Sequence, residues 1–321
     1  MSFKLSNYLS QPPAVKCLLF GEGKTGKTTF TMSLLNLVAQ GYHIIYIDAD
    51  KSMNVAFGRD VPYADKIDYI QLRDEAYVTI MPFISYLFSK ADFWYDAKTG
   101  EVVADYRFHK NPKALTKINA SHIDSKTIII LDSLTALSES MFNKLREKQG
   151  YQATSFDKDK LYNGQVQQYY GVLSTEFAEF LDRLSNINAT VFVIAHTKTV
   201  EKKDKAGNVI ERKIYPLATT INSAESLSKY FDECLYFTAR AGKYYVSAVP
   251  SSDICGVGGR QVPAKQFTQA ELAAVDILKM YNHNVSNSIP SVPAFHDIHL
   301  VDDGTEETAQ KVALTSNKIT L

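Results

Sequence analysis

The chain has 321 residues, 45% of them hydrophobic and 22% charged, which is typical of globular proteins and unlike disordered or fibrous ones. Thirty-five basic residues balance thirty-five acidic ones, so a chain-wide attraction to nucleic acid or membranes is excluded and such binding would need local patches. The three cysteines lie far apart without a C-x-x-C pair, which argues against a zinc site or a disulfide framework. With no secretory pattern and no apolar run of membrane-spanning length, these features predict a cytoplasmic protein without a membrane partner.

Short apolar runs alternate with longer helical patterns along most of the chain. The runs are rich in β-branched residues and lack polar alternation, as expected for strands of a parallel sheet buried on both faces. They cover residues 15–20, 43–47, 127–131 and 190–195. Apolar residues at helical spacing are Phe30, Leu34, Leu37 and Val38 after the first run, and Phe177, Phe180, Leu181 and Leu184 before the fourth. The alternation predicts an α/β fold with a mostly parallel central sheet flanked by helices.

Two β-hairpins are expected outside this alternation. Residues 92–108 are predicted to form an inserted hairpin that turns around 98–100, and a second hairpin after Phe231 is predicted to turn at Ala241 and Gly242. Helical periodicity is lost near residue 281. We therefore predict an N-terminal segment over 1–13, one α/β domain over 14–280, and a flexible, mildly acidic tail over 281–321.

A glycine-rich stretch, FGEGKTGKTTF, connects the first predicted strand to the first predicted helix. Its residues satisfy G-x-x-x-x-G-K-[ST], which is the P-loop pattern in its expected context. Glycine lets backbone N–H groups surround phosphate oxygens, Lys27 reaches the β- and γ-phosphates, and Thr28 supplies a ligand to Mg²⁺. The sequence therefore predicts a site for ATP and Mg²⁺. Its residues are Gly21, Glu22, Gly23, Lys24, Thr25, Gly26, Lys27, Thr28 and Thr29.

Polar residues end three further predicted strands. Asp132 follows the run TIIIL and is the expected Walker B acid, which would hold the metal together with Thr28. The second run ends in Asp48 and Asp50; either could orient the attacking water, and Asp50 is preferred as general base. His196 ends the fourth run, at the sheet edge where ligands bind, and could sense the γ-phosphate. Helix capping by the acids, or a buried and satisfied histidine, is the alternative.

The order of these parts resembles the core of RecA-like P-loop ATPases. The resemblance covers about residues 14–250 and is to compact phage-encoded recombinases and single-strand annealing proteins above all, and more loosely to RecA, RadA and ring helicases related to DnaB. It implies a Mg-dependent, DNA-stimulated ATPase whose catalytic residues are Lys27, Asp50, Asp132 and His196. RecA itself has glutamate and glutamine where this chain has Asp50 and His196, which leaves the efficiency of hydrolysis open.

The resemblance also implies a homo-oligomer, either a ring or a filament. RecA-like ATPases usually complete the nucleotide site with a cation from the next subunit. Candidates for this cation are Arg240, Lys243 and Arg260. The tail could recruit a single-strand-binding protein or a replication partner, or it could shield the basic loops.

The resemblance further implies two DNA-binding loops, at residues 148–166 and 197–215. The first interleaves cations with aromatic residues, which suits phosphate contacts and base stacking. The second holds six basic and three acidic residues and is predicted to form a hairpin that turns at Ala206, Gly207 and Asn208. The DNA-binding candidates are Lys158, Lys160, Tyr162, Lys202, Lys203, Lys205 and Arg212. A solvated charged face is the alternative for both intervals.

Three functions remain open from the sequence. The preferred one is an ATP-dependent recombinase or strand-annealing protein of phage type that binds single-stranded DNA. The second is a DnaB-like DNA motor or helicase-loader ATPase. The third is a nucleotide-dependent switch or small-molecule kinase without a DNA role, which the balanced overall charge permits.

Overall fold

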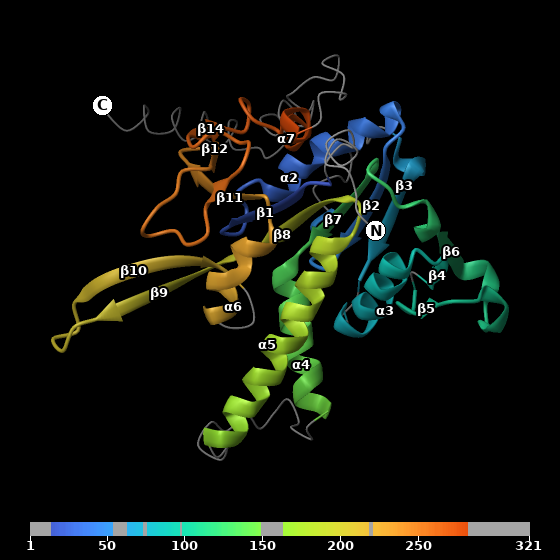
Figure 1. Ribbon diagram of the computed structural model, residues 1–321, viewed down its shortest axis with the longest axis horizontal. Coiled ribbons are helices and arrows are strands. Elements are labelled where there is room, and N and C mark those ends of the chain that lie inside the picture. Colours follow the sequence, from blue (N-terminus) through green and yellow to red (C-terminus); the bar gives the residue numbers. More distant parts are fainter. Residues whose placement is uncertain are drawn as a thin grey trace, which may run out of the picture.

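The structure, a computed structural model, describes residues 14–53, 63–72, 76–96, 98–148, 163–217 and 221–281. One large sheet forms its centre, with the strand order β14-β12-β11-β1-β8-β7-β2-β3 and β13 paired to β11 (Figure 1). The parallel part consists of β3 (Ile67–Gln71), β2 (His43–Asp48), β7 (Thr127–Asp132), β8 (Thr190–Ala195), β1 (Lys16–Gly21) and β11 (Glu233–Arg240). The antiparallel part consists of β12 (Lys243–Ser247), β13 (Gly258–Gly259) and β14 (Gln266–Thr268).

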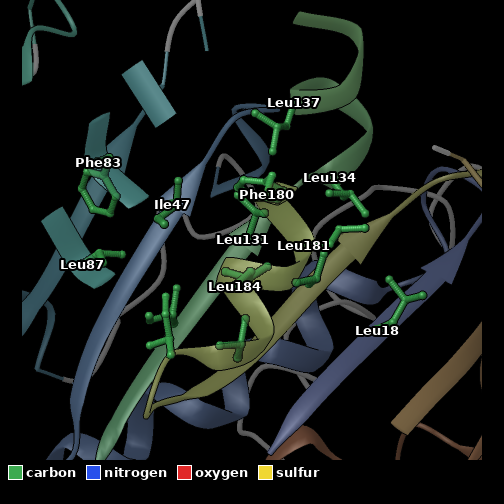
Figure 2. Packing of buried hydrophobic residues seen from close by; sticks show 14 of the residues in the cluster. Leu18, Ile47, Phe83, Leu87, Leu131, Leu134, Leu137, Phe180, Leu181 and Leu184 are labelled. Atoms are coloured by element: carbon green, nitrogen blue, oxygen red, sulfur yellow. The ribbon is translucent and has the colours of Figure 1, made fainter. Parts of the chain in front are cut away.

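All four predicted central strands are confirmed, and their burial explains why their sequences are apolar without alternation. Successive side chains of a strand point to opposite faces of the sheet. Ile129 and Leu131 of β7 join the core under α3, α4 and α5, whereas Ile128 and Ile130 join the core under α2 and α7. Figure 2 shows Leu131 beside residues of α4 and α5. Both faces of the sheet are therefore covered, as α/β folds require.

The helices divide between these two faces. On one face α2 (Lys27–Met32) continues into the 3₁₀ segment η1 (Ser33–Gln40), which ends at Gly41 with φ 79°, and α7 (Ala274–Tyr281) packs against both. The other face carries α3 (Ala76–Ser89), α4 (Leu134–Lys148) and α5 (Asn163–Asn186). The short helix α6 (Ile221–Ser226) packs against the 3₁₀ segment Leu227–Tyr230, whose Leu227 joins the same core. Both predicted apolar helix faces are confirmed. In the first, Phe30, Leu34 and Leu37 are buried and Val38 packs against them; in the second, all four predicted residues are buried.

The insertion after α3 is a three-stranded antiparallel sheet, which corrects the predicted hairpin. It has the order β5-β4-β6, formed by β4 (Phe93–Asp96), β5 (Val102–Val103) and β6 (Leu115–Ile118). The predicted turn around Gly100 is present, but Tyr106–Phe108 is a 3₁₀ turn instead of strand, because the side chain of Asp105 accepts a hydrogen bond from Arg107 N and ends the extended segment. The third strand lies beyond the predicted end at residue 108.

Two further hairpins form as predicted, one within the large sheet and one as a separate two-stranded sheet. The β11–β12 hairpin turns at Ala241 and Gly242, both with positive φ. The hairpin of β9 (Thr197–Lys203) and β10 (Val209–Pro216) turns through Gly207, whose φ is 88°, and Asp204 accepts hydrogen bonds from two backbone N–H groups of that turn. It projects from the body of the molecule (Figure 1).

The first predicted DNA loop, 148–166, overlaps the ends of two helices. Lys148 is the last residue of α4 and residues 163–166 belong to α5, so both ends of the predicted loop are helical. The connecting residues 149–162, with the candidates Lys158, Lys160 and Tyr162, lie outside the described residues, as do 1–13 and the tail from residue 282. Within the described ranges, no helix is long and apolar enough to cross a membrane.

Candidate active site

The residues predicted for nucleotide chemistry meet at the carboxyl-terminal edge of the parallel strands. The strand register places Phe20 beside Ala195, and Asp132 beside both Asp48 and Ile194. The loop after β1, the acids after β2 and β7, and His196 after β8 therefore emerge next to one another. In open α/β sheets, this edge is where ligands bind.

The P-loop connects β1 to α2, as predicted, and two of its glycines are required by their surroundings. Gly26 has a φ of 84°, which L side chains rarely adopt, and it precedes the first residue of α2. A Cβ at Gly21 would lie 2.4 Å from the carbonyl oxygen of Phe237 on the neighbouring strand β11. Glu22, Gly23 and Lys24 form the exposed part of the loop.

Lys27 lies inside this loop. Its ammonium group donates hydrogen bonds to the backbone oxygens of Gly21 at 3.0 Å and Glu22 at 2.6 Å. Burial lowers the pKa of Lys27 to about 8, against the opposite effect of the nearby Asp132 and Asp50 carboxylates. Among the described residues no carboxylate contacts this cation directly, and an anionic phosphate would neutralise it.

We expect nucleotide affinity to fall by about fivefold between pH 8 and pH 9, because free Lys27 passes from half to about one-tenth protonated while phosphates keep their charge. The sign follows from linkage: a bound phosphate raises the lysine pKa, so binding takes up a proton above pH 8. Titration with a fluorescent ATP analogue across this range measures the effect. The control is Lys27→Arg, whose guanidinium stays charged and should flatten the profile; equal profiles in both proteins would contradict the expectation.

Asp132 accepts hydrogen bonds from three hydroxyl groups. Its Oδ2 atom accepts hydrogen bonds from Thr28 Oγ1 at 2.7 Å, Ser52 Oγ at 2.6 Å and Tyr46 OH at 3.0 Å. Burial raises the pKa of Asp132, partly offset by the hydrogen bonds from Ser52 and Thr28. The adjacent hydroxyl and carboxylate of Thr28 and Asp132 are hard oxygen donors and fit Mg²⁺, which would neutralise phosphate charge when bound.

The two acids at the end of β2, Asp48 and Asp50, have different environments. Asp48 is fully buried and accepts hydrogen bonds from Ser52 N, Ser52 Oγ, Met53 N and Tyr69 OH, all within 3.1 Å, so its oxygens are occupied in holding the loop after β2. The Asp50 side chain is 26% exposed and contacts Ser133 Oγ at 2.6 Å and His196 Nε2 at 3.3 Å. Only Asp50 keeps an approach from solvent.

Asp50 is ionised at neutral pH. Burial raises its pKa, but the hydrogen bonds from His196 and Ser133 outweigh burial and hold the pKa below its ordinary value. His196 is itself positioned through its backbone N–H, which donates to Thr135 Oγ1 at 2.8 Å. Asp50 is thus a charged carboxylate that contacts His196 at the end of β8, two strands away in the sheet. Such a carboxylate is suited to orient a water for attack.

Gln269, which follows β14, contacts the P-loop and was not predicted from the sequence. Its side chain is 2% exposed, and Nε2 donates to the backbone oxygen of Thr25 at 3.1 Å. A Cβ at Gly26 would lie 2.6 Å from the same nitrogen, so the amide packs directly on the loop. Its Oε1 is buried without a hydrogen-bond partner among the described residues. Ser52, Ser133 and Tyr46 were also missed, although Ser133 follows Asp132 directly.

The predicted trans-acting cations lie on or near the β11–β12 hairpin. Arg240 and Lys243 are exposed and face one another across its turn. Arg260 is 72% exposed and pairs with Asp232 of its own chain, with Nη1 2.8 Å from Oδ1. Their action on a neighbouring subunit stays a prediction. The DNA-binding candidates Lys202, Lys203, Lys205 and Arg212 are all exposed on the β9–β10 hairpin.

Comparisons with known proteins place the chain in a family. A family model described as an AAA domain matches residues 14–258. No curated protein matches the chain. The crystal structure of the RadB recombinase covers 82% of this chain and 91% of its own, with 12% sequence identity and a TM-score of 0.39, a likeness too low to bear on function. Because the family model spans most of the chain, including its P-loop and Asp132, the protein belongs to this AAA-domain family.

Proposed function

We propose that the protein is an ATP-dependent, single-stranded-DNA-binding recombinase or strand-annealing protein of phage type. The observation that supports this function is the place of the β9–β10 hairpin. Its first residue, Thr197, follows His196 directly, and His196 contacts Asp50 in the candidate active site. A change in the contacts of His196 on ATP binding would therefore act at the base of the hairpin, and would couple nucleotide state to DNA binding.

In the proposed reaction, Lys27 binds the β- and γ-phosphates and Asp50 orients and accepts a proton from the attacking water. Thr28 and Asp132 hold Mg²⁺, and His196 responds to the presence of the γ-phosphate. Hydrolysis would be Mg-dependent and stimulated by DNA. We place the protein in the cytoplasm as a homo-oligomer, ring or filament, in which Arg240, Lys243 or Arg260 serves the neighbouring site, and in which the tail contacts a single-strand-binding or replication partner.

The strand register divides the charges of the hairpin between two faces. Paired residues of an antiparallel ladder point to the same side, and residues two apart along a strand share that side. Lys198, Lys202 and Lys213 lie on one face together with Glu211, which pairs with Lys213 at 3.0 Å. On the other face are Lys203, Arg212 and Glu201. The first face carries the larger excess of positive charge, so we assign the main DNA contact to it.

We expect neutralisation of the first face, by Lys198→Gln, Lys202→Gln and Lys213→Gln together, to weaken single-stranded DNA binding and flatten its salt dependence. Each lost phosphate contact removes about 0.7 from the log–log salt slope, so three contacts change it by about two. Fluorescence polarisation at several salt concentrations measures both quantities. The matched control, Lys203→Gln with Arg212→Gln, removes charge from the other face and should change the slope less.

The same titrations, together with an assay of duplex unwinding, separate the competing functions. Equal behaviour of both variants and the unmodified protein would remove the hairpin from DNA binding. Absence of any single-stranded DNA binding, with and without ATP, would contradict the proposal and favour a switch or a kinase. Directional unwinding of duplex DNA without a homologous strand would instead select a motor.

A further inference from the structure

The outer face of the insertion sheet carries an aromatic residue where a polar one is expected. In the central strand β4, Phe93 and Tyr95 are buried, and Phe93 packs on Phe83 of α3 with ring centroids 4.7 Å apart. Trp94 lies between them and points to the opposite face. Strand alternation with one buried face normally places polar side chains there. The chain instead places its sole tryptophan at this position, where it is half-buried.

Further aromatic and cationic groups surround Trp94. Val103 and Lys117 are its partners on the two neighbouring strands, and Lys117 Nζ lies 6.0 Å from the centroid of the indole ring. The ring of Tyr106 packs on Trp94 with centroids 5.3 Å apart. Near them in the chain, Phe108 is 87% exposed, more than any other large hydrophobic side chain among the described residues. We call Trp94, Tyr106, Phe108 and Lys117 the aromatic face.

Polar contacts fix the backbone before and after the exposed Phe108. Before it, Asp105 accepts a hydrogen bond from Arg107 N at 3.0 Å and fixes the 3₁₀ turn. After it, the buried His109 side chain lies between two acids, with Nε2 3.3 Å from Glu101. These anchors fix the backbone of the phenylalanine, so its exposure is a property of an ordered turn. An exposed ring on a fixed backbone is pre-organised for a planar ligand.

The charge of this region identifies the class of ligand. Residues 106–117 contain four cations and no acid. Arg107 pairs with Asp105 and Lys117 with Asp92, whereas Lys110 and Lys113 are exposed in the same stretch. Aromatic planes next to cations suit an unpaired nucleic-acid strand, whose bases stack while its phosphates meet the lysines. An apolar protein surface would gain nothing from these cations, because burying them would cost desolvation energy.

We propose that the aromatic face is a second contact for single-stranded DNA, in which Phe108 and Trp94 stack on bases and Lys110 and Lys113 contact phosphates. The inference rests on the proposed function, since it uses the same ligand. The insertion and the β9–β10 hairpin lie on opposite sides of the molecule (Figure 1), so the aromatic face would bind a separate stretch of strand. A protein that pairs or exchanges strands needs two such stretches.

Trp94 supplies a direct readout, because no other tryptophan contributes to the fluorescence. Titration with oligothymidylate should quench Trp94 fluorescence as bases stack on the ring. Phe108→Ala should weaken binding to this face by about fivefold or more at nearly constant salt slope. Lys110→Gln with Lys113→Gln should lower that slope by about 1.4. Val249→Ala, a substitution of another exposed apolar residue outside the insertion, is the control for general effects and should change neither.

The outcomes distinguish this inference from the proposed function. Polarisation that reports DNA binding without any change in Trp94 fluorescence, and without an effect of Phe108→Ala, overturns the aromatic face and leaves the proposed function intact. Quenching that persists with full affinity in Phe108→Ala and in the double lysine variant also overturns it. Absence of DNA binding in the polarisation assay overturns both. Quenching that the hairpin variant retains and Phe108→Ala weakens supports the inference.

Discussion

Asp50→Asn should reduce ATP turnover at least about 100-fold while leaving nucleotide affinity unchanged. Asparagine keeps the size of the side chain and can still accept the hydrogen bond from Ser133, which lies 2.6 Å away. It loses the negative charge that would draw a proton from the attacking water, and with it the contact between the carboxylate and His196 Nε2. Steady-state turnover and binding of a fluorescent ATP analogue, measured on the same preparation, separate the two effects.

The neighbouring acid provides the control. Asp48 accepts four hydrogen bonds in a fully buried position. In Asp48→Asn the NH₂ group of the asparagine would face groups that also donate, so the substitution should lower the free energy of unfolding by about 1–3 kcal/mol. Thermal unfolding detects this loss. Unchanged turnover in Asp50→Asn would remove Asp50 from the role of base and transfer that role to Asp48.

The central sheet and the P-loop could be predicted because their causes are local in sequence. A strand buried on both faces requires an unbroken apolar run, and β7, with all six residues buried, has one. The P-loop needs glycine at Gly26 for its positive φ and Lys27 immediately after it, and both requirements appear within a few residues. The insertion was predicted only in part, since β6 pairs with β4 across a connection that holds two 3₁₀ turns.

Residue roles that depend on tertiary contacts could not be predicted. Asp48 and Asp50 stand two residues apart after the same strand, and only the donors around each, such as Tyr69 from β3, separate a structural acid from an accessible one. Lys202 and Lys203 are equivalent in a count of charges, but the β9–β10 register places them on opposite faces. Gln269 contacts Thr25 across 244 residues of sequence, a distance at which no local pattern is informative.

Gln269 belongs to the segment between β14 and α7, which packs against the P-loop. Its backbone N–H donates to Tyr244 on β12, and Glu271 fixes the turn before it by accepting hydrogen bonds from both N and Oγ1 of Thr268. The following helix α7 packs on α2 and η1, where Val275 N donates to Ser33 Oγ. This segment lies beyond residue 258, where the family match ends. The P-loop is therefore contacted by a residue outside the matched region as well as by residues within it.

Gln269→Glu should lower nucleotide affinity more than about tenfold at pH 8, because a buried carboxylate would replace the donor to Thr25 and face its carbonyl oxygen without a partner. Relative to the unmodified protein, affinity should recover as the pH falls toward 5, since a protonated glutamic acid can donate to that oxygen again. The pH dependence that Lys27 causes is the same in both proteins, so it cancels when the affinity of the variant is divided by that of the unmodified protein. The control Gln269→Met keeps the length of the side chain without its polar atoms, so its smaller loss should not depend on pH. Titration with a fluorescent ATP analogue measures each ratio, and a glutamate variant that matches the unmodified protein throughout would exclude Gln269 from positioning the P-loop.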